Sequence, residues 1–183
     1  MAITYTDTSD STQPLESRYN TLAQERELYL ERARDCSELT IPTLIPQDGY
    51  TGAEEFETTY QGIGARGVNN LASKLLLSLL PPNAPFFRLA IDNFAVREIE
   101  EDENLRTQID SGLVKIEKAV MDDIEMSNDR VAVFEALKHL IVGGNALLFV
   151  SNEGLRVFPL SQYVLERDPM GNVLEIITKE SIA

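Results

Sequence analysis

The hydrophobic pattern of this chain changes its period once, close to Gly143 and Gly144. Before that point apolar residues recur every three or four positions, the spacing of one face of an α-helix. After it come short apolar or alternating runs separated by turn residues, which are typical of β-strands. The change predicts a helix-rich α+β fold, in which amphipathic helices are followed by a small antiparallel β-meander.

Four amphipathic helices are predicted before the change, over residues 15–36, 62–80, 98–126 and 129–142. Pro14 suits the start of the first helix, prolines end the second, and Gly143-Gly144 ends the fourth. The first apolar stripe is interrupted at Arg26 and comprises Leu15, Tyr19, Leu22, Tyr29, Ala33 and Cys36. The third stripe comprises Leu105, Ile109, Leu113, Ile116, Val120 and Ile124. The second helix ends in LLLSLL, which is apolar nearly all round and predicts cover on several sides.

Strands are expected at FFRLAI (86–91) and, after the change in period, over 146–150, 155–160, 163–167 and 172–178. In the turn before the last run, Pro169 suits position i+1 and Gly171 is free to take a positive φ. Residues 163–178 are therefore predicted to form an antiparallel hairpin.

The chain divides into three regions on this pattern. Residues 1–14 are rich in Ser, Thr and Asp and predict a flexible tail. Residues 15–145 form the helical region, and residues 146–183 form the meander. The last residues begin a new helical pattern, from which we expect the chain to continue beyond Ala183.

The chain has 183 residues and a formal net charge of −14, from 16 basic and 30 acidic side chains. This balance opposes non-specific attraction to nucleic acid or to anionic membranes. The single cysteine, Cys36, precludes an intrachain disulfide and fits a reducing compartment. No apolar run approaches the roughly 20 residues that span a bilayer, and the first residues do not resemble a signal peptide.

A G-x-G-x-x-G spacing at Gly62, Gly64 and Gly67 is the fingerprint of a dinucleotide-binding turn. That fold requires a buried parallel strand directly upstream, whereas the upstream segment AEEFETTY contains three glutamates. The alternative is that small residues let a helix begin close to a neighbouring backbone. We favour this packing interpretation over nucleotide binding.

Other candidate chemistry is weak. The acidic run Glu98–Glu103 is most simply the first turn of a helix, and not a metal site. His139 is the only histidine, and no second one is present for a zinc motif. Cys36 is interpreted as a small buried hydrophobe. No catalytic, cofactor-binding or metal-binding residue is predicted.

Three blocks of this sequence, taken in order, resemble the podovirus-type portal, or head-to-tail connector, of short-tailed bacteriophages. They are GARGVNNLASKLLLSLLPP (64–82), FEALKHLIVGGNALLFV (134–150) and LSQYVLERDPMGNVLEIITKESIA (160–183), and ERARDCSELTIPTLIP (31–46) is similar to the family's early segment. The first block is the most specific. The Ser/Thr/Asp-rich tail and the PPNAPFF segment depart from the family.

The resemblance implies structural roles, without catalysis, for the residues that match the family's blocks. These are Gly64, Ala65, Arg66, Gly67, Asn69, Asn70, Leu71, Lys74, Phe134, Gly144, Asn145, Asp168, Gly171 and Asn172. It also implies that Gly64 to Gly67 open a packed helix.

The same resemblance implies a twelve-fold homo-oligomeric ring at one capsid vertex, through which double-stranded DNA is packaged and ejected without specific binding. Partners would be capsid and scaffolding proteins, terminase and the tail adaptor. The match covers mostly the wing region of a longer subunit, without its stem and clip. The expected location is the virion, after assembly in the host cytoplasm. Two alternatives remain: a nucleotide-dependent enzyme using the glycine motif, and a generic acidic interaction domain.

Overall fold

The computed structural model describes residues 14–47, 49–50, 55–56, 60–82, 84–90, 103–152 and 154–180. Its helices are α1 (Leu15–Glu38), α2 (Ile63–Leu79), α4 (Glu103–Met126) and α5 (Asp129–Gly143). Its strands are β1 (Leu147–Ser151), β2 (Gly154–Phe158), β3 (Tyr163–Arg167) and β4 (Val173–Thr178), with a short 3₁₀ helix, η1 (Leu160–Gln162). The predicted helix-rich α+β fold is confirmed. The predicted tail before Pro14 and the predicted helical residues 98–102 lie outside the described residues.

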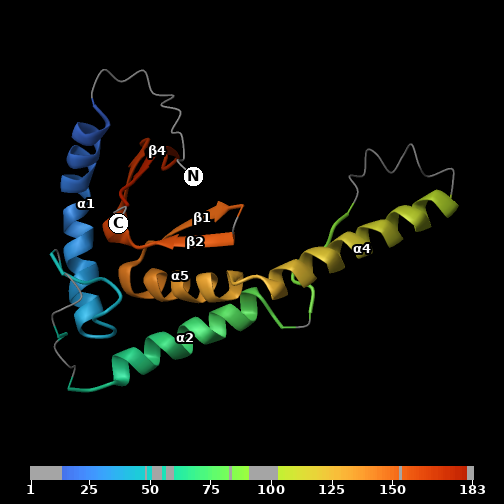
Figure 1. Ribbon diagram of the computed structural model, residues 1–183, viewed down its shortest axis with the longest axis horizontal. Coiled ribbons are helices and arrows are strands. Elements are labelled where there is room, and N and C mark those ends of the chain that lie inside the picture. Colours follow the sequence, from blue (N-terminus) through green and yellow to red (C-terminus); the bar gives the residue numbers. More distant parts are fainter. Residues whose placement is uncertain are drawn as a thin grey trace.

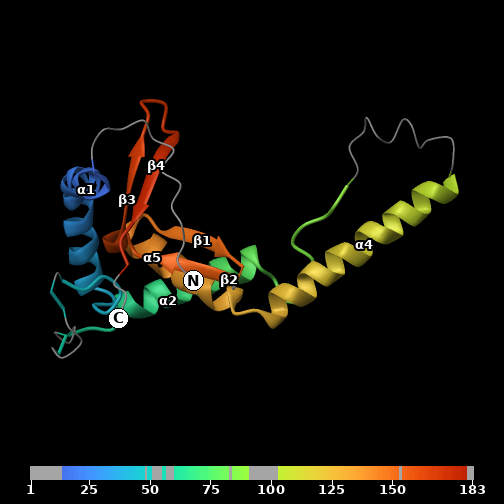
Figure 2. The same cartoon turned by 45° about the horizontal axis from the view of Figure 1, so that its top comes forward.

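Helix α5 lies at the centre of the body and contacts α1, α2 and β2. Figure 1 shows α2 along one side of α5 and the β1–β2 hairpin along the other, while α1 stands across the end of α5. The β3–β4 hairpin rises beside α1, as Figure 2 shows after the rotation. The body is thus a three-layer arrangement around one central helix.

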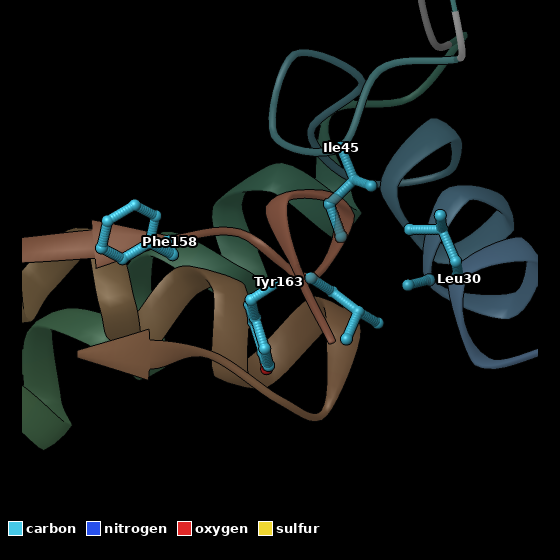
Figure 3. Close-up of a cluster of buried hydrophobic side chains, with 6 residues drawn as sticks. Leu30, Ile45, Phe158 and Tyr163 are labelled. Atoms are coloured by element: carbon cyan, nitrogen blue, oxygen red, sulfur yellow. The ribbon is translucent and has the colours of Figure 1, made fainter. Parts of the chain in front are cut away.

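The core lies where α1 meets the strands and the loop that follows it. It comprises Leu30, Ala33, Ile45, Phe158, Leu160 and Tyr163. Figure 3 shows Leu30 of α1, Ile45 of the loop and Tyr163 of β3 converging, with Phe158 of β2 farther along. Segments distant in sequence therefore share one apolar cluster, which makes their burial cooperative.

The buried face of α1 differs from the predicted stripe. Leu30 and Ser37 are buried, whereas their neighbours Tyr29 and Cys36 are exposed. Cys36 is therefore not the buried hydrophobe that the pattern predicted. The Ser37 hydroxyl donates to the Ile41 carbonyl at 2.7 Å and accepts from the Ile45 amide at 3.2 Å. These two bonds satisfy the hydroxyl and let a polar residue occupy the core side of the helix.

All four strands predicted after the change in period are present, but they form two separate hairpins. β1 pairs with β2, and β3 pairs with β4, both antiparallel. No pairing joins β2 to β3. Pro159 lacks an N–H, and η1 follows it directly, so the chain turns away from β2 before β3 begins.

The strand predicted over residues 86–91 is not formed at residues 86–90, and Ile91 lies outside the described residues. The Leu89 amide donates instead to the Glu117 carboxylate of α4 at 2.6 Å. This segment runs beside a helix, and no strand of the described residues pairs with it to complete a ladder, which explains the difference.

Helix α4 projects away from the body in both views (Figures 1 and 2). The helix itself is confirmed, but its predicted apolar stripe is only partly covered by the described residues: Ile116 is 52% exposed and Val120 is 39% exposed. Among residues 106–126 of this helix, only Met121, which lies off that stripe, is buried. The side of α4 that contacts the body is therefore a different side from the one that carries the stripe.

Candidate functional site

The first residues of α2 lie against the loop that follows α1. An added Cβ at Gly64 would be 2.8 Å from the Leu39 carbonyl oxygen and 3.1 Å from the Thr40 Cγ2. Real Cβ atoms do not approach a backbone oxygen this closely, so only glycine fits here. Packing against a neighbouring backbone therefore accounts for Gly64, as the packing interpretation predicts.

The other glycines of the motif have no such neighbour. An added Cβ at Gly62 or Gly67 would meet nothing within 4 Å. Gly62 precedes the helix with φ −81° and ψ 13°, so it does not use glycine's access to positive φ. Among the described residues before α2, at positions 55–56 and 60–62, none is in a strand. The strand-turn-helix context of a dinucleotide fingerprint is therefore missing in the described part.

Helix α2 is packed on one side and exposed on the other. Val68 and Ala72 are buried, and this side meets α5. Gly64 and Ala65 are half-buried, whereas the other matching residues of the helix are exposed: Arg66, Gly67, Asn69, Asn70, Leu71 and Lys74. Leu71 is apolar and yet 46% exposed. Packing within the described chain therefore explains only part of the GARGVNNLASKL block.

The C-terminal turns of α2 are also only partly covered. Leu75 and Leu76 are half-buried, while Leu77 and Leu79 are 57% and 53% exposed. The helix end is bound by Arg130, whose guanidinium donates to the Leu80 carbonyl at 2.7 Å. A cation at a helix C-terminus satisfies a free carbonyl and opposes the helix dipole.

The corner between α4 and α5 also holds the first hairpin. Asp129, in the first turn of α5, accepts a hydrogen bond from the Leu155 amide at 3.0 Å. Gly154 lies beside that carboxylate with φ +117°. Asp129 thus binds β2, and the adjacent Arg130 binds the end of α2, so two neighbouring residues of α5 fix this corner to two other elements. The sequence did not point to either: an acid such as Asp129 at a helix start has an ordinary explanation in the dipole, and no local pattern singles out Arg130.

The end of α5 confirms the predicted glycine stop. Gly144 takes φ +73°, and its amide donates to the Leu140 carbonyl at 3.0 Å. An added Cβ at Gly143 would be 3.3 Å from Ile45 Cδ1. Phe134 is half-buried, with the Lys138 ammonium 4.9 Å from its ring centre, and Asn145 is exposed just after the stop. Gly144 turns the chain from α5 into β1.

The predicted hairpin turn at residues 168–171 is confirmed. The Gly171 amide donates to the Asp168 carbonyl at 2.9 Å, and Gly171 takes φ +90°. The Asp168 carboxylate accepts from the Asn172 backbone amide at 2.7 Å and from its side-chain amide at 2.8 Å. The Asn172 side-chain bond is the largest of the effects that lower the pKa of Asp168. The matching residues Asp168, Gly171 and Asn172 thus build one turn.

Two arginines of α1 hold the second hairpin. Arg26 donates to the Ser161 carbonyl at 3.2 Å and to the Tyr163 carbonyl at 2.7 Å. Arg18 forms an ion pair with Glu175 of β4. The signal for Arg26 was present in the sequence, because it interrupts an apolar stripe. Arg18 lies off that stripe and gave no signal.

A cavity of about 320 Å³ lies between α1 and the second hairpin. Its lining is Leu22, Glu25, Arg26, Tyr29, Asn145, Leu160, Tyr163, Val164, Leu165 and Arg167. Asn145 therefore lies on the same cavity wall as Arg26, which binds the second hairpin. The Arg26 guanidinium is engaged with backbone carbonyls, which gives this cavity a structural explanation.

The remaining polar candidates give no reactive cluster. His139 is buried on α5, its Nδ1 has no hydrogen-bond partner among the described residues, and burial lowers its pKa. Within the described ranges, no three His, Cys, Asp or Glu side chains lie close enough together to bind a metal ion. In the same ranges, no helix is both long and apolar enough to cross a membrane.

Comparison with known proteins places these features in a family. The model of the family described as "Bacteriophage head to tail connecting protein" matches residues 12–183. The portal protein of Escherichia phage T7 is 40% identical over 173 residues, 91% of this chain and 32% of that protein. The portal protein of Enterobacteria phage T3 is 39% identical over 90% of this chain and 32% of that protein. For the portal protein of Enterobacteria phage SP6 the identity is 32%, over 85% of this chain and 30% of that protein.

The chain spans about a third of the length of these curated relatives. The match nevertheless extends over nearly all of the present sequence, including α2, the α5 stop and the 168–172 turn. The chain belongs to the family of bacteriophage head to tail connecting proteins.

Proposed function

We propose that this chain is part of a phage portal subunit, a structural protein that forms a homo-oligomeric ring at a unique capsid vertex. Genomic double-stranded DNA passes through the ring during packaging and ejection. The observation that carries the proposal is the 40% identity with the T7 portal protein over 91% of the chain. In this proposal the ring has twelve subunits, as the resemblance implies.

Residues 15–145 form the helical part of the wing in this proposal, and residues 146–183 form its β part. The contacts that support a scaffold role are those that tie elements together: Arg26 to β3, Arg130 to α2 and Asp129 to β2. No catalytic, cofactor or metal role is assigned to any residue.

The partners follow from the same proposal. Capsid and scaffolding proteins surround the ring at the vertex, and terminase and the tail adaptor bind parts of the subunit outside this sequence. The protein is a virion component and is assembled in the host cytoplasm.

DNA passes this region without being bound by it. Duplex affinity comes largely from Lys and Arg that neutralise phosphates, and here acidic side chains outnumber basic ones by 30 to 16. Every phosphate contact would also have to break as the duplex advanced. A gel-shift assay with this chain at about 50 mM salt, where phosphate contacts are strong, should show no duplex binding. Micromolar binding that weakens steeply with salt would contradict this part of the proposal.

A nonsense mutation in the phage gene tests the function itself. Infected cells should accumulate heads without DNA, and the full-length gene supplied in trans should restore filled, tailed particles. The matched control is an in-frame synonymous change at the same codon. Filled, infective particles in normal numbers from the nonsense mutant, with the protein absent by immunoblot, would refute the proposal.

A further inference from the structure

We propose that α4 of one subunit docks on the outer side of α2 of the neighbouring subunit, so that these two helices form a head-to-tail contact of the ring. The inference rests on the proposed function, because it requires a ring of identical subunits. It assigns a partner to two helix faces that the described chain leaves open.

The first face is the apolar stripe of α4, here called the α4 stripe. It comprises Ile109, Leu113, Ile116, Val120 and Ile124, which recur at helical spacing. Ile116 and Val120 are 52% and 39% exposed, and the other three are half-buried. The neighbours of α4 lie elsewhere: Ala84 and Pro85 border a cavity with Val114, Met121 and Asp122. An apolar stripe on a projecting helix loses its exposure only if something outside the described chain covers it.

The second face is the outer side of α2, here called the α2 outer face. It comprises Ile63, Arg66, Asn70, Lys74 and Leu77, which follow one another at three- and four-residue steps. All five are exposed, Ile63 and Leu77 by 69% and 57%. They lie opposite Val68 and Ala72, which face α5. In Figure 1 this side of α2 forms the lower edge of the body.

The two faces match in length and in charge. From Ile63 to Leu77 the α2 outer face is about 21 Å long, and from Ile109 to Ile124 the α4 stripe is about 22 Å long, at 1.5 Å per residue. Two of the chain's basic residues and none of its acidic ones lie on α2. Acidic residues outnumber basic ones on α4, and Asp123 lies on the flank of the stripe. Opposite charges beside apolar seams favour one register over others.

The contact has to form between two copies. Within one chain, α5 follows α4 and covers the inner side of α2, so the α2 outer face is turned away from its own α4. A contact between two different faces repeats from subunit to subunit and closes a ring when the rotation allows. DNA is the less suitable partner for the α2 outer face. Only two cations lie there to neutralise phosphates, and the exposed apolar side chains of Ile63 and Leu77 do not bind phosphates.

Two variants of the full-length subunit test the contact from its two sides. Arg66→Glu with Lys74→Glu reverses the charge of the α2 outer face, and Ile116→Gln with Val120→Gln makes the α4 stripe polar. All four side chains are exposed, so each subunit should keep its fold, which circular dichroism checks. Each variant should need about tenfold or more protein to reach half assembly in sedimentation velocity.

Two matched controls should assemble like the wild type. Lys115→Glu with Lys118→Glu makes the same change of charge on α4, at two exposed positions on the back of the helix, away from the stripe. Val131→Gln makes the same apolar-to-polar change on α5, where the side chain is 66% exposed.

Mixing the two interface variants gives the sharpest outcome. Each retains one intact face, so one subunit's α2 pairs with the other's α4, but the chain of contacts cannot continue. At a concentration where neither variant alone assembles, the mixture should therefore show one-to-one pairs by native mass spectrometry, whereas each variant alone stays monomeric.

Three results would overturn the inference. Wild-type rings with undiminished assembly of both variants would exclude this contact while leaving the proposed function intact. Intact rings with a lost duplex affinity in the Arg66/Lys74 variant would assign the α2 outer face to DNA. Failure of the wild-type full-length subunit to form any ring would remove the proposed function, and this inference with it.

Discussion

Gly64 and Gly67 provide a matched pair for testing why glycine opens α2. Both lie in the same helix, and alanine has a higher intrinsic helix propensity than glycine by about 1 kcal/mol. Their surroundings differ: an added Cβ at Gly64 would be 2.8 Å from the Leu39 carbonyl oxygen, whereas one at Gly67 would meet nothing within 4 Å. Gly64→Ala and Gly67→Ala should therefore gain the same helix propensity, and only Gly64→Ala should introduce a steric clash with Leu39.

The magnitudes follow from those two terms. Gly67→Ala should raise the free energy of unfolding by about 0.5–1 kcal/mol, because it gains propensity and nothing else changes. At Gly64 the added methyl group forces the α2 start away from the loop, and overpacking of this kind costs about 1–3 kcal/mol. Subtracting one variant from the other cancels propensity, so the difference in unfolding free energy should be about 1–3 kcal/mol.

Urea unfolding of the 183-residue chain, followed by circular dichroism at 222 nm, measures both values. The slopes against urea should agree, so that midpoints report stability directly. If the two alanine variants have the same stability within about 0.5 kcal/mol, the close approach at Leu39 does not explain the glycine, and the packing interpretation is wrong.

Three further predictions concern the turn, the α1 anchor and the buried histidine. Gly171→Val should destabilise the chain by about 1 kcal/mol or more in the same urea assay, because a β-branched residue resists positive φ; unchanged stability would contradict the +90° turn. Arg26→Met should cost about 1–3 kcal/mol, because it leaves the Ser161 and Tyr163 carbonyls without their donor, while Arg32→Met, at an exposed position, should cost little. Burial lowers the pKa of His139 below its usual 6.5, so the unfolded chain binds its proton more readily than the folded one. The stability that the neutral histidine contributes should thus be fully present above pH 6.5 and decline as the pH falls below it. His139→Gln should therefore make the free energy of unfolding vary less with pH between about pH 7.5 and about pH 5.5. Identical pH profiles for both proteins would exclude this cause.

Local chemistry made part of the fold predictable. Gly143-Gly144 ends α5 where expected, and the 168–171 turn forms because Pro169 and Gly171 each suit one backbone conformation. The four strands also lie close to their predicted bounds. Each of these signals acts within a few residues of its own position, so tertiary contacts were not needed to see it.

Other features depend on partners that are distant in the sequence. Ser37 is buried because the Ile41 carbonyl and the Ile45 amide satisfy its hydroxyl, and hydropathy alone favoured its neighbour Cys36. Residues 86–90 have apolar character, but no strand in the described ranges pairs with them, so they form none. The division of the meander into two hairpins depends on how η1 directs the chain into the core through Leu160.

The candidate site was partly predictable from helical spacing. The spacing of apolar residues in the second helix places Val68 and Ala72 on one side and Arg66 and Asn70 on the other, and the structure confirms this division. Gly64, Val68 and Ala72 face the body, whereas Arg66, Asn70 and Lys74 face outward. No periodicity in the sequence distinguishes a side packed within the chain from a side reserved for another subunit.

The central claim is that this chain belongs to the ring-forming subunit of a phage portal. Native mass spectrometry of the purified full-length gene product measures it most directly, because the mass gives the number of subunits without a reference structure. The account predicts one dominant closed species with the mass of twelve subunits, which keeps its size when the protein is diluted from high concentration. Monomers alone, or a continuous series of open oligomers that grows with concentration, would contradict it.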